Sequence, residues 1–169
     1  MLIPEKLTNF NVYDAGKRLV GVTSELTLPN LEAMTETVSG AGIMGEYDSV
    51  TPGHFGSITA EMSFRTLYDE NFSLLDPKGK TLIFRGSQQF NDTEKGLVNR
   101  ALKITIRGKA KGVDLGKLGV GTPLETKIPF EVTYIKVEEN NKVLLELDKL
   151  NYIYILNGVD VLKEIRNQI

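Results

Sequence analysis

Hydrophobic and polar residues alternate with a period of two over most of this chain, which is the spacing of a β-strand with one buried face. The clearest case is Gly56–Leu67, in which Ile58, Ala60, Met62 and Phe64 fall on one face and polar residues fall on the other. We expect the apolar face to pack in a core and the polar face to meet water or another subunit.

The same alternation predicts further strands separated by turn residues. Gly16 and the pair Asn140-Asn141 supply the backbone freedom that two tight hairpin turns need, and Pro29 ends a strand because proline cannot donate to a ladder. The other expected strands are Phe10–Tyr13, Arg18–Val20, Ser24–Leu28, Ala33–Ser39, Thr81–Phe90, Val98–Arg107, Lys127–Val137 and Lys142–Leu150, with a short one near Val113–Leu115.

Two segments follow a helical spacing instead. Tyr68–Leu75 begins with acidic residues, which favour a helix N-terminus, and Val159–Asn167 has an apolar stripe formed by Val161, Leu162, Ile165 and Ile169. About nine strands and two helices predict a mainly β fold: an antiparallel β-sandwich or barrel with a short flanking α-helix and a C-terminal helix. With 169 residues, no repeat and no linker, we expect a single domain over 1–169.

Three segments lack a core pattern and are candidates for contacts between molecules. Ser39–Gly56 is predicted to be a long loop of eighteen residues with five glycines and one proline, and Gly108–Thr126 to be a second glycine-rich loop. Residues 1–9 are expected to form an extended N-terminal segment. Loops of this length without structure of their own are uncommon in compact domains and tend to be functional.

The residues available for catalysis or metal binding are few. There is no cysteine and a single histidine, His54, whereas a zinc site takes three or four ligands that are mostly His or Cys. Ser57 is the nearest nucleophile in sequence, but a strand directs it away from a residue three positions back. Ser39–Gly45 contains a G-x-G-x-x-G spacing, yet an acidic segment follows it in place of a helix, so no dinucleotide site is expected.

Composition narrows the function further. Carboxylates are plentiful, but glycosidase clefts are usually lined by aromatics, especially Trp, and this chain has no Trp. The net charge is −2 without a basic stripe, so the chain does not have the charge pattern of a nucleic-acid binder. No apolar stretch is long enough to predict a membrane span. We therefore expect no catalytic residue, no cofactor and no metal.

Motifs spread from Ile3 to about Asp160 give a more specific indication. They are Ile3–Pro4, Asn9–Tyr13, Leu26–Thr37, Ser39–Ile43, Gly45–Asp48, Gly53–Gly56, Arg107–Gly108, Leu115–Leu118, Phe130–Tyr134 and Asn157–Asp160. In this order they resemble the phage major tail tube protein family, which serves contractile, myovirus-type tails and phage-tail-like R-type bacteriocins.

This resemblance implies two antiparallel sheets with a short helix at the side. It implies hexameric rings that stack into a hollow tube, in which one sheet of each subunit joins a continuous lumenal β-barrel. The partners would be further copies of the chain, a tail sheath protein, a tape measure protein, a baseplate hub and a tail terminator, with DNA only as non-specific passing cargo. The location would be a virion tail or bacteriocin particle, assembled in the host bacterial cytoplasm.

Specific residues follow from the loops and from this resemblance. The candidates for contacts between rings or subunits are Ile3, Pro4, Gly40, Gly42, Ile43, Glu46, Tyr47, Asp48, His54 and Phe55. Glu61 and Glu131 are the candidates for the lumen, because a negative wall would not hold the phosphates of passing DNA. Three alternatives remain: a ligand-binding β-sandwich of the carbohydrate-binding type, an enzyme on a β-barrel, and a type VI secretion tube-like protein.

Overall fold

The computed structural model describes all residues from Met1 to Ile169 and contains eleven strands and two short helices. The strands are β1 (Leu2–Asp14), β2 (Lys17–Leu19), β3 (Ala33–Ser39), β4 (Glu46–Phe55), β5 (Thr59–Phe64), β6 (Lys80–Asp92), β7 (Gly96–Ala110), β8 (Thr126–Glu139), β9 (Lys142–Asp148), β10 (Ile153–Leu156) and β11 (Val159–Asp160). The helices are α1 (Asp69–Ser73) and α2 (Lys163–Gln168). The expected class, mainly β with a flanking and a C-terminal helix, is confirmed.

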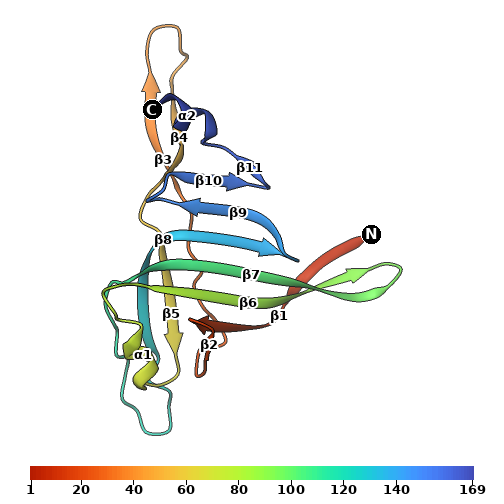
Figure 1. The fold of residues 1–169 in the computed structure, drawn as a ribbon, viewed down its shortest axis with the longest axis vertical. Coiled ribbons are helices and arrows are strands. Elements are labelled where there is room, and N and C mark those ends of the chain that lie inside the picture. Colours follow the sequence, from red (N-terminus) through yellow and green to blue (C-terminus); the bar gives the residue numbers. More distant parts are fainter.

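Nine strands form one antiparallel sheet and two form a separate one. The large sheet has the order β11-β10-β9-β8-β7-β6-β1-β2, and β5 pairs with β8 outside this path. The first half of β8 pairs with β5 from Thr126 to Glu131, whereas its second half pairs with β9 from Tyr134 to Glu139. The long strand β8 thus links two parts of the sheet that enclose the core between them (Figure 1).

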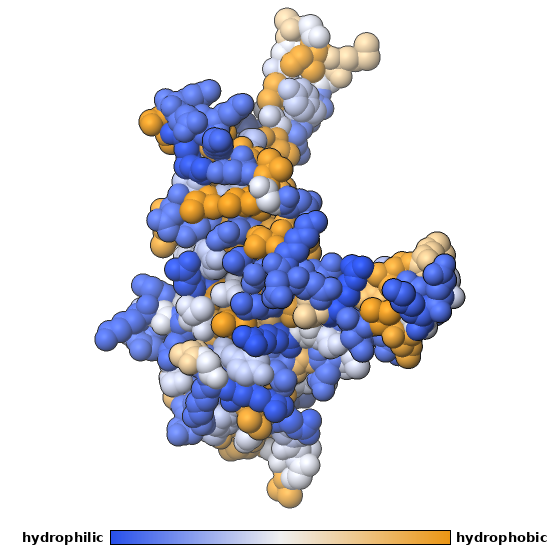
Figure 2. Space-filling view, turned by 45° about the vertical axis from the view of Figure 1, so that its right-hand side comes forward, coloured by the Kyte–Doolittle hydropathy of each residue, from blue (hydrophilic) through white to orange (hydrophobic).

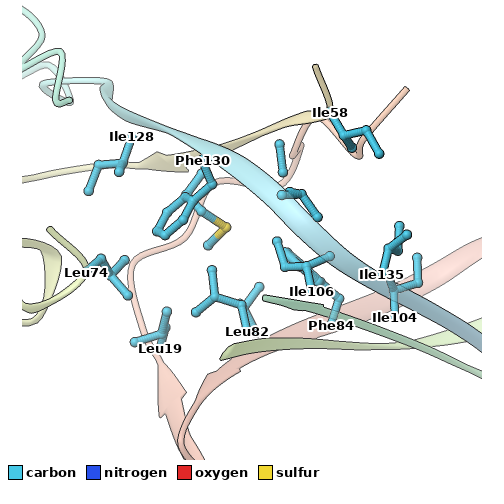
Figure 3. Packing of buried hydrophobic residues seen from close by; sticks show 14 of the residues in the cluster. Leu19, Ile58, Leu74, Leu82, Phe84, Ile104, Ile106, Ile128, Phe130 and Ile135 are labelled. Atoms are coloured by element: carbon cyan, nitrogen blue, oxygen red, sulfur yellow. The ribbon is translucent and has the colours of Figure 1, made fainter. Parts of the chain in front are cut away.

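The core lies where β5 and β8 face β6 and β7. The apolar face predicted for β5 is confirmed, because Ile58, Ala60, Met62 and Phe64 are all at most 2% exposed. Figure 3 shows residues of these strands converging, with Leu74 next to α1 closing one end of the cluster. Each fully buried side chain of this kind stabilises the fold by about 1.5–3 kcal/mol relative to its exposed state.

Both predicted hairpin turns are present. Asn140 and Asn141 have φ angles of +46° and +64° between β8 and β9, and Ala15 and Gly16 have +47° and +84° between β1 and β2. Two consecutive residues with positive φ are typical of the tight turns whose twist matches the flanking strands. The segment after β7 is a loop from 111 to 125, as expected, with one isolated bridge between Asp114 and Lys127.

The strand predicted at Ser24–Leu28 does not form a regular ladder. Thr23 donates to the carbonyl of Ser63 at 3.0 Å, and Glu61 donates to the carbonyl of Thr27 at 3.1 Å. Three residues separate the two contact points on this segment, whereas only one separates them on β5. The extra residues bulge away from the sheet, which interrupts the pairing.

The long loop predicted at Ser39–Gly56 is wrong for most of its length. Strand β4 takes up Glu46–Phe55 and pairs with β3, leaving only residues 40–45 as a turn. The predicted C-terminal helix is also shorter at its start, because Asn157 and Gly158 form a turn that leads into β11, and α2 begins only at Lys163. The N-terminal segment is extended, as expected, within β1.

Three projections give the molecule its outline in Figure 1. The β3–β4 hairpin extends from one end of the longest axis, and the loop 111–125 lies at the opposite end. The turn between β6 and β7 projects sideways, together with the N-terminus. These three features are the most distant from the core and therefore the most accessible to other molecules.

Candidate assembly surfaces

The β3–β4 hairpin, which we name the arm (residues 33–55), lacks a core of its own. None of its residues is buried, and its exposed apolar side chains are Met34, Ile43, Met44, Tyr47 and Val50. Figure 2 shows hydrophobic side chains along this projection at the top of the view. An isolated two-stranded hairpin is at best marginally stable in water. The arm is therefore a candidate surface for contact with another molecule.

Six of the predicted contact residues come together at the tip of the arm. Gly40 accepts a hydrogen bond from the backbone of Ile43 at 3.1 Å, which closes the turn. Asp48 accepts a hydrogen bond from the Thr37 hydroxyl across the hairpin at 2.8 Å. The six are Gly40, Gly42, Ile43, Glu46, Tyr47 and Asp48, and all are exposed. Because side chains alternate along a strand, Glu46 and Asp48 share one face and Tyr47 lies on the other.

The remaining residues predicted on this segment, His54 and Phe55, lie at the base of the arm. The ring of Phe55 meets Tyr154 edge-on at 5.2 Å between centroids and packs against the core, and His54 meets Tyr152 in the same manner at 6.0 Å. They hold the arm to its own subunit. Gly53 allows a close approach here, because a Cβ at this position would lie 2.6 Å from Cδ1 of Leu162.

The C-terminal segment supports this base. Arg166 forms an ion pair with Asp160 and donates to the carbonyl of Tyr152 at 3.1 Å, while Asp160 accepts from the backbone N–H of Leu162 at 3.2 Å. The Arg166 guanidinium holds the pKa of the Asp160 carboxyl below its usual range. Leu162 is 1% exposed. Sequence reasoning missed this anchor; its signal was the Asn157–Asp160 stretch, whose turn sets the course of the chain.

Ile3 and Pro4 lie elsewhere, on the sideways projection. Pro4 stands opposite Phe90 in the β1–β6 pairing, and the carbonyl of Met1 accepts from the backbone of Thr93. The structure therefore does not bring these two residues to the arm tip of the same subunit (Figure 1). β2 covers β1 only from Val12 to Asp14, so the rest of this edge of β1 has no partner strand in the chain. An unpaired edge strand is a template for pairing with another chain.

Glu61 and Glu131 lie on the same face of the sheet. Thr59 stands opposite Glu131 and Glu61 opposite Pro129, so the two carboxylates are neighbours on the polar side of β5 and β8. Each carboxylate has an ion-pair partner. Nζ of Lys127 lies 3.6 Å from Oε1 of Glu61, and Nζ of Lys111 lies 3.0 Å from Oε2 of Glu131.

Glu131 is fixed more firmly than its neighbour. Its Oε2 accepts a hydrogen bond from the Ser57 hydroxyl at 2.7 Å, and its Oε1 accepts one from the backbone of Ile58 at 3.4 Å. The Ser57 hydrogen bond, assisted by Lys111, lowers the pKa of the Glu131 carboxyl below its usual range. Sequence reasoning placed the two glutamates on polar faces but did not find their lysine partners, which come from a strand and a loop far along the chain.

The cavities and the potential metal-ligating side chains give little indication of a ligand or metal site. The most apolar hollow, of about 380 Å³, lies beneath the bulged segment 24–28 and is lined mainly by hydrophobic residues of β1, β6 and β7. No cluster of three or more His, Asp or Glu side chains is arranged to hold a metal ion. No helix has the length and apolar character required to cross a membrane. What the structure offers is surface for contact between proteins.

The comparisons with known proteins agree over the whole chain. A family model described as phage tail tube protein FII matches residues 4–169. The tail tube protein of Escherichia phage P2 is 31% identical over 173 residues, covering 100% of this chain and 99% of that protein. The major tail tube protein of Serratia phage KSP20 is 27% identical over 158 residues, covering 94% of this chain and 91% of that protein.

Proposed function

The chain belongs to the phage tail tube protein family, whose members are non-catalytic structural components of virions, and we propose that its copies close into hexameric rings that stack into the inner tube of a contractile tail. The observation that carries this proposal is the arm. It is a hairpin with no buried residue, held by an anchored base, and it extends from one end of the long axis (Figure 1).

Contact between successive rings is assigned to the arm tip. Its turn contains Gly40, Gly42 and Gly45, and a Cβ placed on any of them would meet nothing within 4 Å, so the tip has room to adapt to another surface. Ile43 and Tyr47 offer apolar area next to the carboxylates Glu46 and Asp48. Such a contact is head-to-tail and does not close on itself, so it repeats from ring to ring.

Contact within a ring is assigned to the free edge of β1, which includes Ile3 and Pro4. Pairing of this edge with a sheet edge of the adjacent subunit extends the large sheet around the ring. A closed barrel of this kind removes exposed edges altogether. Six subunits then form a continuous lumenal barrel.

The face that carries Glu61 and Glu131 is assigned to the lumen. The positive charges of Lys127 and Lys111 compensate the negative charges of the two carboxylates. This wall is therefore close to neutral rather than strongly negative. A wall of this kind has little attraction for phosphate, because binding to nucleic acid rests on uncompensated cations. DNA then passes as non-specific cargo.

The remaining partners follow from membership of a tail. The outer wall faces a sheath protein while the tail is extended, the lumen holds a tape measure protein during assembly, and the tube ends contact a baseplate hub and a tail terminator. The particle is a phage tail or a phage-tail-like bacteriocin assembled in the host cytoplasm. The tube serves as a conduit for DNA or as the rod that punctures a membrane.

The experiment is negative-stain electron microscopy of concentrated protein beside an arm-shortened variant. In the variant, Asn-Gly replaces residues 37–48 and joins Glu36 to Ser49, which stand opposite each other in the ladder. This dipeptide is well suited to a two-residue hairpin turn. We expect tubes of uniform width from the wild type, and a folded subunit that forms no tube from the variant.

Two results would contradict the proposal. A wild-type protein that stays monomeric at high concentration, even in the presence of baseplate extract as a nucleus, would refute tube formation. A shortened variant that builds tubes of normal length would remove the arm from the contact between rings. Circular dichroism and thermal unfolding of both proteins verify that the comparison is between folded subunits.

A further inference from the structure

Charge is segregated along this chain in a way that its net value of −2 conceals. No Lys or Arg occurs between Arg18 and Arg65, a stretch that contains the whole arm. The carboxylates of this stretch are Glu25, Glu32, Glu36, Glu46, Asp48 and Glu61. Three of these belong to the arm and are exposed. All charged side chains of the arm are therefore negative.

The opposite end of the molecule has the opposite charge. From Arg107 to Lys127, both included, the chain has five cations and two carboxylates, Asp114 and Glu125. Arg65 lies beside this loop, because its carbonyl accepts a hydrogen bond from the backbone of Leu124 at 2.8 Å. We name Arg65 together with residues 111–125 the loop end.

Two cations of the loop end have no ion-pair partner. At its margins, Lys127 and Lys111 form ion pairs with carboxylates of β5 and β8. Arg65 and Lys117 are exposed and have no ion-pair partner. Leu124 connects their backbones, because Lys117 donates to the Leu124 carbonyl at 2.9 Å. Of the two carboxylates here, Asp114 accepts a hydrogen bond from the backbone of Gly116 within the loop.

Both ends also expose apolar side chains on glycine-rich turns. Met44 at the arm tip is 104% exposed, and Leu118 and Val120 on the loop end are 93% and 105% exposed. Because the arm and the loop end lie at opposite ends of the longest axis, these surfaces cannot meet within one subunit (Figure 1). They can meet only between copies that are arranged head to tail.

We propose that the acidic face of the arm of one copy, with Glu46 and Asp48, docks on Arg65 and Lys117 at the loop end of the next copy along the tube. This inference rests on the proposed function, since it names the acceptor for the arm of the stacked rings. The charges steer the encounter and fix its register, and Met44, Leu118 and Val120 supply apolar contact area.

The test reverses the charges in pairs and follows tube formation by electron microscopy and sedimentation. We expect Glu46→Lys/Asp48→Lys to abolish tubes, and Arg65→Glu/Lys117→Glu to do the same. The variant that combines all four changes regains complementarity and should again form tubes. It also regains the wild-type net charge of −2.

A matched variant separates complementarity from net charge. Glu94→Lys/Glu164→Lys with Arg65→Glu/Lys117→Glu has the same net charge but leaves an acidic arm opposite an acidic loop end. We expect no tubes from it. Tubes from this control, or none from the complementary fourfold variant, would overturn the docking assignment. Wild-type tubes should also shorten as salt is raised from about 0.1 to 1 M, because the screening length falls from about 10 to 3 Å.

The two proposals fail in different ways. If the wild type forms no tubes under any condition, the proposed function fails. If the wild type forms tubes and charge reversal leaves their length unchanged, tube formation stands and only the acceptor surface is wrong. Thermal unfolding of each variant in dilute solution verifies that the subunit is folded before its assembly is scored.

Discussion

The arm and the β8–β9 hairpin are both antiparallel ladders closed by a turn with positive φ angles, and they differ in what their side chains reach. The β8–β9 hairpin buries Ile135 and Leu147 in the core, at 4% and 1% exposed. The arm buries nothing along its length and is held only at its base. The β8–β9 hairpin is stabilised by core contacts within the chain, whereas most of the arm has no such contacts.

This difference is the reason for assigning assembly contacts to the arm. A residue that packs in the core of its subunit contributes to the free energy of unfolding of that subunit. A residue that contacts only a neighbouring subunit contributes almost nothing to it in the monomer. Substitutions should therefore divide into two classes: those that destabilise the subunit and those that affect only the polymer. The predictions below test this division, beginning with the largest effect.

Phe130→Ala and Val50→Ala compare the core part of β8 with the arm. Phe130 is 1% exposed in the core, and removing a buried aromatic side chain costs about 3–5 kcal/mol of the free energy of unfolding. Val50 is 56% exposed on the arm, so its loss should change that free energy by less than about 0.5 kcal/mol. Urea unfolding of the dilute monomer measures both. Similar losses from the two substitutions would mean that the arm is part of the subunit's cooperative core.

Gly53→Ala and Gly42→Ala test the boundary between the two regions. Both glycines have a positive φ, +74° and +89°, but a Cβ on Gly53 would overlap Leu162 whereas one on Gly42 would meet nothing. We expect Gly53→Ala to lower the free energy of unfolding by about 1–2 kcal/mol, from backbone strain and displacement of the anchor. Gly42→Ala should strain only the tip and leave global unfolding unchanged.

Amide hydrogen exchange checks the cause. In Gly53→Ala, protection should fall across the arm and α2 together while β8 retains its own. Unchanged protection of α2 would show that the C-terminal segment does not hold the arm.

The sequence predicted well what local pattern controls. The alternation in β5 identified Ile58, Ala60, Met62 and Phe64 as one buried face, and the Asn140-Asn141 turn was found because it depends on adjacent residues. Loop 111–125 was recognised for the same reason. These features need no knowledge of which strands pair.

The features that were missed depend on contacts between distant residues. The bulge at 24–28 arises from its match to β5. Strand β4 forms because β3 offers a partner, although the glycines and proline of Ser39–Gly56 indicated a loop. The contact of Gly53 with Leu162 joins residues more than a hundred positions apart. Six of the ten predicted contact residues lie together at the arm tip, because a glycine-rich turn is a local feature of the sequence. Their contact with another subunit stays a prediction.

The smallest expected effect concerns the carboxylate of Glu131, which is fixed in the body of the subunit, whereas Glu46 on the arm has no side-chain partner. The Ser57 hydroxyl is the main reason that the pKa of Glu131 is lowered. A lowered pKa means that the charged form is favoured on folding. Its contribution is therefore present above the ordinary carboxyl pKa and is lost as the pH falls through the lowered value.

Ser57→Ala should raise the pKa of Glu131 toward its ordinary range and weaken the decline of stability on acidification. The side-chain carbon chemical shift of Glu131, followed by NMR during a pH titration, measures the first effect, and urea unfolding at several pH values measures the second. Ser63→Ala is the matched control, since Ser63 lies on the same face of β5 but bonds to neither glutamate. An unchanged Glu131 titration in Ser57→Ala would contradict the role of the hydroxyl and assign the shift to Lys111 and the backbone N–H of Ile58.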